Sequence, residues 1–179
     1  MDNKGVSLVE LSIAITVALL TFAILFYVTF TLQTNVNIAS GLLGMSEKGR
    51  LAVNYISQDI REAKAVRSSY GSYSTGGDTL ILDVPSIDGS GNIIDPDTKF
   101  DVIIYTLDSA DPKKLIRVVY ADGASSRTSG TETIIEDVDS LSFSGTTSET
   151  IGIQITTSTA TADAERQSTI TTSASLRNM

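Results

Sequence analysis

The sequence contains no cysteine, no histidine and no tryptophan. Without cysteine, the chain has no disulfide framework, no thiol nucleophile and no cysteine-based zinc site. Without histidine, it has no imidazole base and no Ser-His-Asp triad. Catalysis would depend on carboxylates, lysine, tyrosine or hydroxyl groups, and no nucleophile–base pair is recognisable among them. We therefore do not expect an enzyme.

Acidity and hydrophobicity are separated along the chain. The 179 residues carry 13 Lys and Arg against 21 Asp and Glu, yet the mean hydropathy is positive at +0.13. Residues 11–32 contain no charged side chain, whereas residues 78–179 hold sixteen acidic and seven basic ones. At about 1.5 Å per residue, a helix over residues 11–32 would be roughly 33 Å long, enough to span a bilayer. Since phosphate binding needs a basic surface, we do not expect direct nucleic-acid binding.

Two common explanations of an apolar N-terminus do not fit this one. A secretory signal peptide has an apolar core of about 7 to 15 residues that ends at an Ala-x-Ala-like site. This chain has a longer core and no such site. A plain signal anchor leaves Glu10 unexplained, because it places a carboxylate at the edge of the apolar run. An unpaired acid near the middle of a bilayer costs about 3 kcal/mol, so we expect Glu10 to have a function and a partner.

Residues 4–11, Lys-Gly-Val-Ser-Leu-Val-Glu-Leu, lead into the uncharged run. This stretch resembles the N-terminal signature of type IV prepilins and type II secretion pseudopilins. The resemblance implies that residues 1–5 are a leader, that a prepilin peptidase cuts between Gly5 and Val6, and that the new Val6 amine is N-methylated. Glu10 would then be the fifth mature residue. A buried carboxylate is the counter-charge that a neighbouring subunit's α-amino group would need, so Glu10 is the predicted assembly residue.

The predicted helix continues beyond the membrane. Apolar residues recur there at three- and four-residue intervals with charged residues mostly between them, which is typical of an amphipathic helix. These residues are Leu42, Met45, Ala52, Ile56, Ile60 and Ala63. No proline interrupts residues 6–67, so we predict a transmembrane and assembly segment over 6–32 and an amphipathic segment over 33–67. Gly41, Gly44 and Gly49 each cost about 1 kcal/mol relative to alanine, which favours a bend or local melting.

Residues 68–179 have the pattern of a β-rich domain, because short apolar segments alternate with Gly, Ser, Asp and Pro. The candidate strands are Thr79–Val84, Val102–Leu107, Leu115–Tyr120, Thr133–Val138, Leu141–Phe143, Ile151–Thr156 and Ser168–Leu176. No long second helix separates them, so the sheet should be mainly antiparallel. The predicted fold is therefore α+β, with a long N-terminal helix packed on a mainly antiparallel β-sheet domain, and the resemblance implies that it is pilin-like.

Shorter motifs in the second half narrow the resemblance. Asp59-Ile60-Arg61-Glu62-Ala63 resembles the helix pattern of the J-class minor pseudopilins and the related W-class minor pilins. The remaining signatures of that group are matched in order by Ile104-Tyr105, Leu115-Ile116-Arg117, Val138 with Leu141 and Phe143, and Leu176-Arg177-Asn178. We expect structural roles here: a solvated or sheet-facing charge pair for Asp59 and Arg61, and an outward strand position for Arg117.

An acidic loop raises the question of a metal. Asp88 to Asn92, followed by Asp95 and Asp97, places oxygen atoms at alternate positions, loosely as at the start of a calcium loop. The loop lacks the glycine at the sixth position and the bidentate glutamate at the twelfth that an EF-hand needs. Asx turns explain the same residues without a metal. We predict no cofactor, with calcium in this loop as the alternative.

The resemblance implies a structural subunit, a minor pilin or pseudopilin that helps to initiate assembly at or near the tip of a type IV pilus or a type II secretion pseudopilus. Its implied partners are other minor and major pilins or pseudopilins, the prepilin peptidase and an inner-membrane assembly platform. Before assembly it would cross the cytoplasmic membrane once, with the globular domain in the periplasm or at the cell surface. The orientation rests on Lys4 and the initiator amine, because the leader also holds Asp2, whereas family leaders are usually basic. The alternative function is a membrane-anchored extracytoplasmic binding module that never polymerises.

Overall fold

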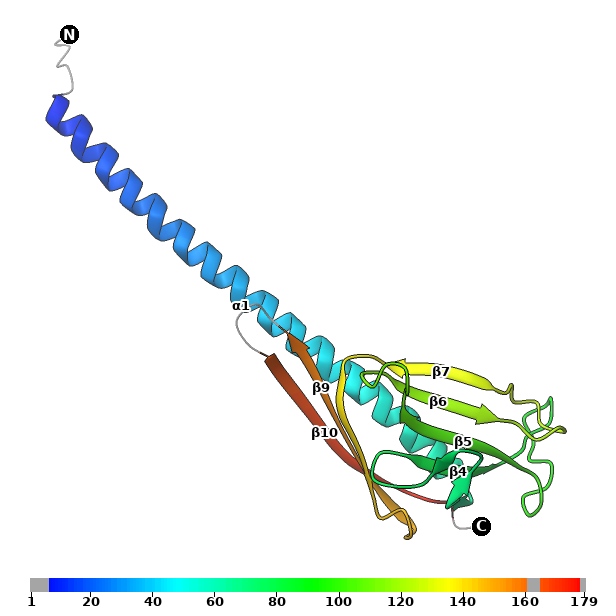
Figure 1. Cartoon of the computed structure of the whole chain (residues 1–179). Helices are drawn as coiled ribbons and strands as arrows, with labels where there is room; N and C mark the ends of the chain where they lie inside the picture. The colour runs from blue at the N-terminus through cyan, green and yellow to red at the C-terminus, as the bar shows by residue number, and fades with distance from the viewer. Residues whose placement is uncertain (1–6, 161–164, 178–179) are drawn as a thin grey trace. The chain divides into compact units, whose positions relative to one another are not determined.

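The computed structural model describes residues 7–160 and 165–177 (Figure 1). In this part of the chain, the helix α1 (Leu8–Glu62) precedes all of the strands. The chain divides into two compact units that meet between Gly41 and Leu42. The first unit holds the N-terminal part of α1, and the second holds the rest of α1 and the strands. The α+β class predicted from the sequence is confirmed.

The strands form two sheets and a small hairpin. They are β1 (Ala65–Val66), β2 (Ser69–Tyr70), β3 (Tyr73–Ser74), β4 (Leu80–Pro85), β5 (Phe100–Leu107), β6 (Leu115–Tyr120), β7 (Gly130–Ile135), β8 (Val138–Ser144), β9 (Thr150–Ala160) and β10 (Glu165–Ser175). The order is β1-β4-β5-β6-β7 in one sheet and β10-β9-β8 in the other, while β2 pairs with β3. All of these pairings are antiparallel, as predicted.

The second part of α1 supplies the centre of the core. Ala52, Ile56 and Ile60 are spaced by one helical turn and are fully buried. They share one apolar cluster with β4 and β5 of the first sheet and with Ile151 and Ile153 of the second. Fully burying an isoleucine stabilises the fold by about 1.5 to 3 kcal/mol. The helix is therefore fixed to both sheets from Ala52 onward, which also fixes the polar side chains on the same face.

The first sheet is buried on its other face as well. Ile81, Val102, Ile104, Ile116 and Val118 form a second apolar cluster, covered by the β2–β3 hairpin through its tyrosines. Strands β4, β5 and β6 are therefore apolar on both faces. This explains why their sequences are nearly continuous hydrophobic runs rather than alternating ones.

Two predicted boundaries are wrong. The helix ends at Glu62 rather than at residue 67, because the backbone N–H groups of Lys64 and Arg67 bond to β4 instead of to the preceding helical turn. The predicted strand Thr133–Val138 is divided between β7 and β8. The break lies at Asp137, whose φ of 64° lies in the left-handed region and cannot continue a strand.

Candidate functional site

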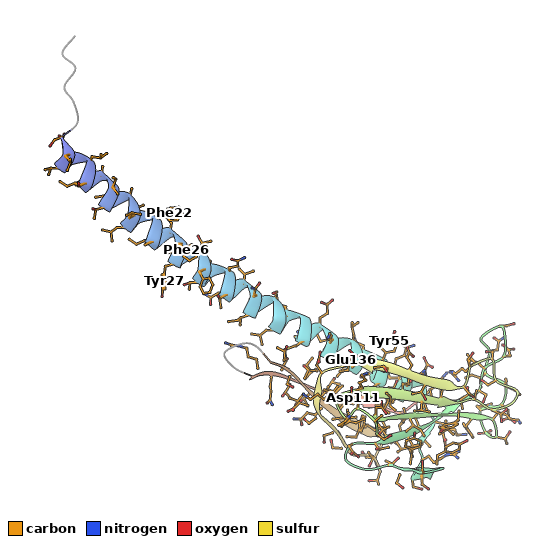
Figure 2. The ribbon with its side chains drawn as sticks, turned by 45° about the horizontal axis from the view of Figure 1, so that its top comes forward. Phe22, Phe26, Tyr27, Tyr55, Asp111 and Glu136 are labelled. Atoms are coloured by element: carbon orange, nitrogen blue, oxygen red, sulfur yellow. The ribbon has the colours of Figure 1, made fainter. Side chains whose placement is uncertain are left out.

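The first candidate site is the apolar surface of the N-terminal part of α1. Its large side chains are exposed, for example Phe22 at 71% and Tyr27 at 72%, and Figure 2 shows both standing out from the helix. α1 is long enough and apolar enough to cross a membrane. An exposed apolar surface of this length needs a nonaqueous environment or a partner.

The polar side chains within this segment are compatible with apolar surroundings. The hydroxyls of Ser12, Thr16, Thr21, Thr29, Thr31 and Thr34 each donate to the backbone carbonyl four residues earlier, at 2.8 to 3.0 Å. A hydroxyl left without a partner in hydrocarbon would cost several kcal/mol. The helix satisfies these groups internally, so they do not oppose transfer into a membrane or a helical bundle.

Of the three predicted site residues, the structure describes Glu10. Gly5 and Val6 lie outside the described residues, so the predicted cleavage site is not placed. The carboxylate of Glu10 is exposed and accepts a hydrogen bond from the backbone N–H of Ser7 at 3.0 Å. Ser7 directly precedes the helix and Glu10 is its third residue, so the pair forms half of a capping box. The Ser-x-x-Glu spacing ahead of an apolar run was the sequence signal for this contact, and it was missed.

The second candidate site joins three of the motif residues named in the sequence. The Tyr105 hydroxyl donates to Oδ2 of Asp59 at 2.6 Å, and Nε of Arg117 donates to the same oxygen at 2.7 Å. Tyr105 and Arg117 are directly opposite each other on β5 and β6. Asp59 therefore faces the sheet, but its partner is Arg117 rather than Arg61. The outward position expected for Arg117 is wrong, because its side chain points toward α1.

The electrostatics of this cluster indicate a structural contact. Burial raises the pKa of the Tyr105 hydroxyl, and the charge of Asp59 raises it further. Burial alone would lower the pKa of Arg117, but its hydrogen bond to Asp59 and the charge of that residue raise it. The tyrosine thus stays neutral and the arginine stays charged at physiological pH. The three groups satisfy one another and hold α1 against β5 and β6.

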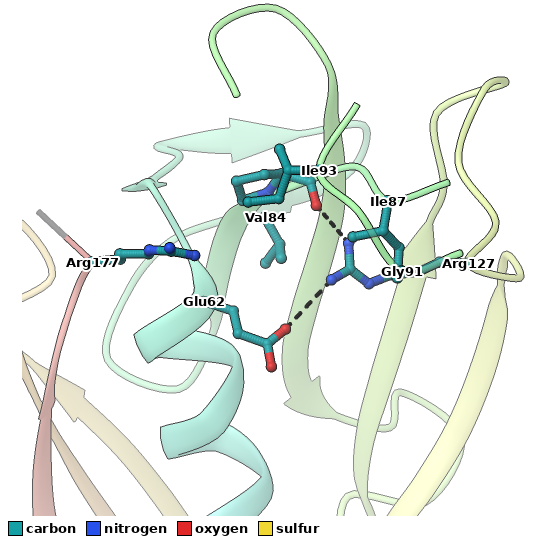
Figure 3. A pocket seen from close by; sticks show the side chains of 8 residues that line it. Glu62, Val84, Ile87, Gly91, Ile93, Arg127 and Arg177 are labelled. Carbon is teal, nitrogen blue, oxygen red and sulfur yellow. Dashed lines mark hydrogen bonds and ion pairs between the residues drawn. The ribbon is translucent and has the colours of Figure 1, made fainter. Parts of the chain in front are cut away.

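The third candidate site is a pocket of about 390 Å³ at the end of α1 (Figure 3). Arg127 crosses it, donating to the backbone oxygen of Pro85 at 2.7 Å and to Glu62 at 3.4 Å. The same guanidinium binds Asp101, which is 0% exposed, at 2.8 Å. Burial alone would raise the pKa of Asp101, but the hydrogen bonds from Arg127, the Asp122 backbone and two serines hold it below its ordinary value. Arg127 is therefore occupied within the protein and anchors the loop after β6.

The acidic loop binds its own backbone. Asp88 Oδ1 accepts the N–H groups of Ser90 and Asn92 at 2.8 and 2.9 Å, and Asp95 accepts the Asp97 N–H at 3.0 Å. The bonds from Asn92 and Ser90 lower the pKa of Asp88, and the hydroxyl of Thr98, which donates to Asp95 at 2.6 Å, lowers the pKa of Asp95 together with the Asp97 N–H. The backbone N–H bonds are the Asx turns considered for this segment. Within residues 7–160 and 165–177, no group of three or more acidic side chains is arranged to hold a metal ion.

The comparisons with known proteins give no family: no protein-family model, no curated protein and no solved structure matches the chain.

Proposed function

We propose that this protein is a minor pilin or pseudopilin, a noncatalytic structural subunit of a type IV pilus or a type II secretion pseudopilus. The prepilin peptidase would cut it between Gly5 and Val6 and methylate the Val6 amine. The mature subunit would be held in the cytoplasmic membrane by α1, with the strands outside. It would assemble with other minor and major subunits, on an inner-membrane platform, at or near the filament tip.

The observation that carries this proposal is the exposed apolar segment of α1 with a carboxylate at its start. The segment buries none of its large side chains within the chain, and it satisfies its own hydroxyls. Glu10 uses one oxygen for the Ser7 N–H, so its second oxygen has no described partner. A neighbouring subunit's N-terminal amine would supply the missing positive charge. Bundling of such helices would cover the apolar surface.

The Asp59 cluster gives independent support for the J- and W-class resemblance. The signature motif that contains Asp59 lies far in the sequence from the two that contain Tyr105 and Arg117, with Asp59 46 residues before Tyr105 and 58 before Arg117. Their polar side chains nevertheless meet at one carboxylate oxygen. Motifs that matched by chance would have no reason to contact one another, so this contact favours a shared head-domain architecture.

The test separates the charge of Glu10 from its capping contact. Glutamine can replace glutamate in a capping box but carries no charge. We therefore expect Glu10→Gln to leave the helix start intact and to abolish filament assembly and co-purification with partner subunits, as Glu10→Val should. Ser7→Ala, which leaves the Ser7 N–H and the Glu10 charge in place, is the matched control and should still assemble.

The opposite result would support a different function. If Glu10→Gln and Glu10→Val both assemble and co-purify like the unmodified protein, the carboxylate has no assembly role. The protein would then be a membrane-anchored binding module that does not polymerise.

A further inference from the structure

Strand β10 has an unpaired outer edge. Among the described strands it pairs with β9 alone (Figure 1). The Leu176 N–H donates across the sheet to Glu149, whereas the Arg177 N–H donates the other way, to Ala63 of the segment after α1. In an antiparallel strand, the backbone N–H and C=O groups of successive residues point to opposite edges. Because Leu176 bonds toward β9, the even-numbered residues of β10 bond to β9 as well. The outward N–H and C=O groups belong to Gln167, Thr169, Thr171, Ser173 and Ser175, and they bond to no other described residue.

This edge lacks the usual protection against pairing. Natural sheets guard an exposed edge with lysine, proline, a bulge or a covering element. From Gln167 to Ser175 the strand has no charged residue and no proline. Its register with β9 is continuous over the whole strand, without a bulge. The edge is therefore straight enough and free enough to accept another strand.

A polar groove lies beside this edge. It has a volume of about 490 Å³ and is lined by Thr172 of β10 and by Val53, Asn54, Ser57, Gln58 and Arg61 of α1. Arg50 lies on the same side of the helix as Arg61, about three turns earlier. Both arginine side chains are exposed. The groove thus offers hydroxyl and amide groups, the guanidinium of Arg61 and the carboxylate of Glu62, with Arg50 farther along the same side of the helix.

Most of the unpaired positive charge lies along β10 and the neighbouring side of α1. Among the described residues, Arg50, Arg61, Lys113, Arg166 and Arg177 form no ion pair with another described side chain. Arg50 and Arg61 lie on the groove side of α1. Arg166 lies at the start of β10 and Arg177 directly follows its end. Nε of Arg166 is buried and has no partner among the described residues. Glu62, a carboxylate at the groove, is bound by Arg127. In an acidic chain, unpaired cations along one strand and the neighbouring side of α1 favour contact with carboxylates.

We propose that the β10 edge, meaning the outward residues of β10 together with Arg50 and Arg61, docks an extended acidic segment of another protein as an additional strand. The backbone edge would supply the hydrogen bonds, and the arginines would select carboxylate side chains. A second copy of this chain fits poorly, because its own β10 has no carboxylate from Gln167 to Ser175 to place against the arginines. The inference concerns the strand domain and does not depend on the proposed assembly function.

The test uses the full-length protein in detergent and a fluorescent peptide of alternating threonine and glutamate. Fluorescence anisotropy should detect binding of this peptide and not of a threonine–lysine peptide. Arg61→Glu should weaken the affinity at least about tenfold, the ratio that corresponds to about 1.4 kcal/mol. Lys113→Glu makes the same change of charge at an exposed lysine outside the groove, so it should leave the affinity unchanged. If Arg61→Glu alters the circular dichroism spectrum, Arg50→Glu replaces it.

The backbone part of the proposal has its own control. Methylating the peptide's amide nitrogens on one edge removes its donors, so the methylated peptide should not bind. The proposal is overturned if the acidic peptide does not bind, if the methylated peptide binds equally well, or if Lys113→Glu weakens binding as much as Arg61→Glu. Dimerisation of the protein that is lost in Thr171→Pro would also overturn it, in favour of a second copy at this edge.

Discussion

Replacing Tyr105 with phenylalanine removes one hydroxyl from the contact that holds α1 to the sheet and leaves the ring in place. The ring is 0% exposed, and the hydroxyl lies 2.6 Å from Asp59. A hydrogen bond to a charged group contributes about 1.5 to 3 kcal/mol. Because the change leaves almost no cavity, we expect the free energy of unfolding to fall by about 2 kcal/mol, or about 30-fold in the unfolding equilibrium.

The assay is urea unfolding of the full-length protein in detergent, followed by circular dichroism of the strand domain. Tyr70→Phe is the matched control, because the Tyr70 hydroxyl bonds to no described residue and its ring packs on Tyr120 with centroids 4.9 Å apart. We expect a change below about 0.5 kcal/mol for the control. Equal effects of the two substitutions, or a loss below about 0.5 kcal/mol for Tyr105→Phe, would refute the account of the Asp59 cluster.

Three further predictions follow from burial and backbone geometry. Since folding raises the pKa of Tyr105, the folded state keeps a proton that the unfolded state releases above about pH 10. The free energy of unfolding should therefore fall above that pH by up to about 1.4 kcal/mol per pH unit. In urea titrations at these pH values, Tyr105→Phe should lose this contribution. Asp101→Asn removes the buried charge opposite a guanidinium and should cost about 3 to 5 kcal/mol in the same assay, whereas Asp111→Asn at the surface should cost little. Gly145→Ala should destabilise the fold more than Gly71→Ala. Both glycines have positive φ, but only at residue 145 would the new Cβ lie 2.6 Å from a backbone oxygen. Equal melting temperatures of the two variants would contradict this.

The sequence predicted the fold best where hydrophobic patterns were strong. The bounds of β6, Leu115–Tyr120, are those expected from its apolar run. Strands β9 and β10 are longer than predicted, because the residues that extend them, mostly serine and threonine in β9 and Glu165 to Gln167 in β10, are held in register by pairing with each other. A run of polar residues shows no alternation of apolar and polar side chains, so the sequence does not predict it as a strand. Only its pairing in the β9–β10 hairpin makes it one.

The candidate sites were harder to predict, because they depend on contacts between distant residues. Arg117 shares its face of β6 with the buried Leu115 and Val119, but Ile116 and Val118 on the other face are buried too. Burial of both faces removes the alternation that would have shown which way the arginine points. The Asp101–Arg127 pair carried no sequence signal, since it joins β5 to a loop beyond the next strand.

The most direct test of the central claim is the mass of the mature protein's N-terminal peptide, purified from membranes of cells that contain a prepilin peptidase. The account predicts that residues 1–5 are absent and that the chain begins with N-methylated Val6. A Gly5 substitution that blocks cleavage should return the full-length mass. Recovery of an uncut chain beginning at Met1, or of a mature start at any residue other than Val6, would contradict the proposal that this protein is processed and assembled as a pilin or pseudopilin.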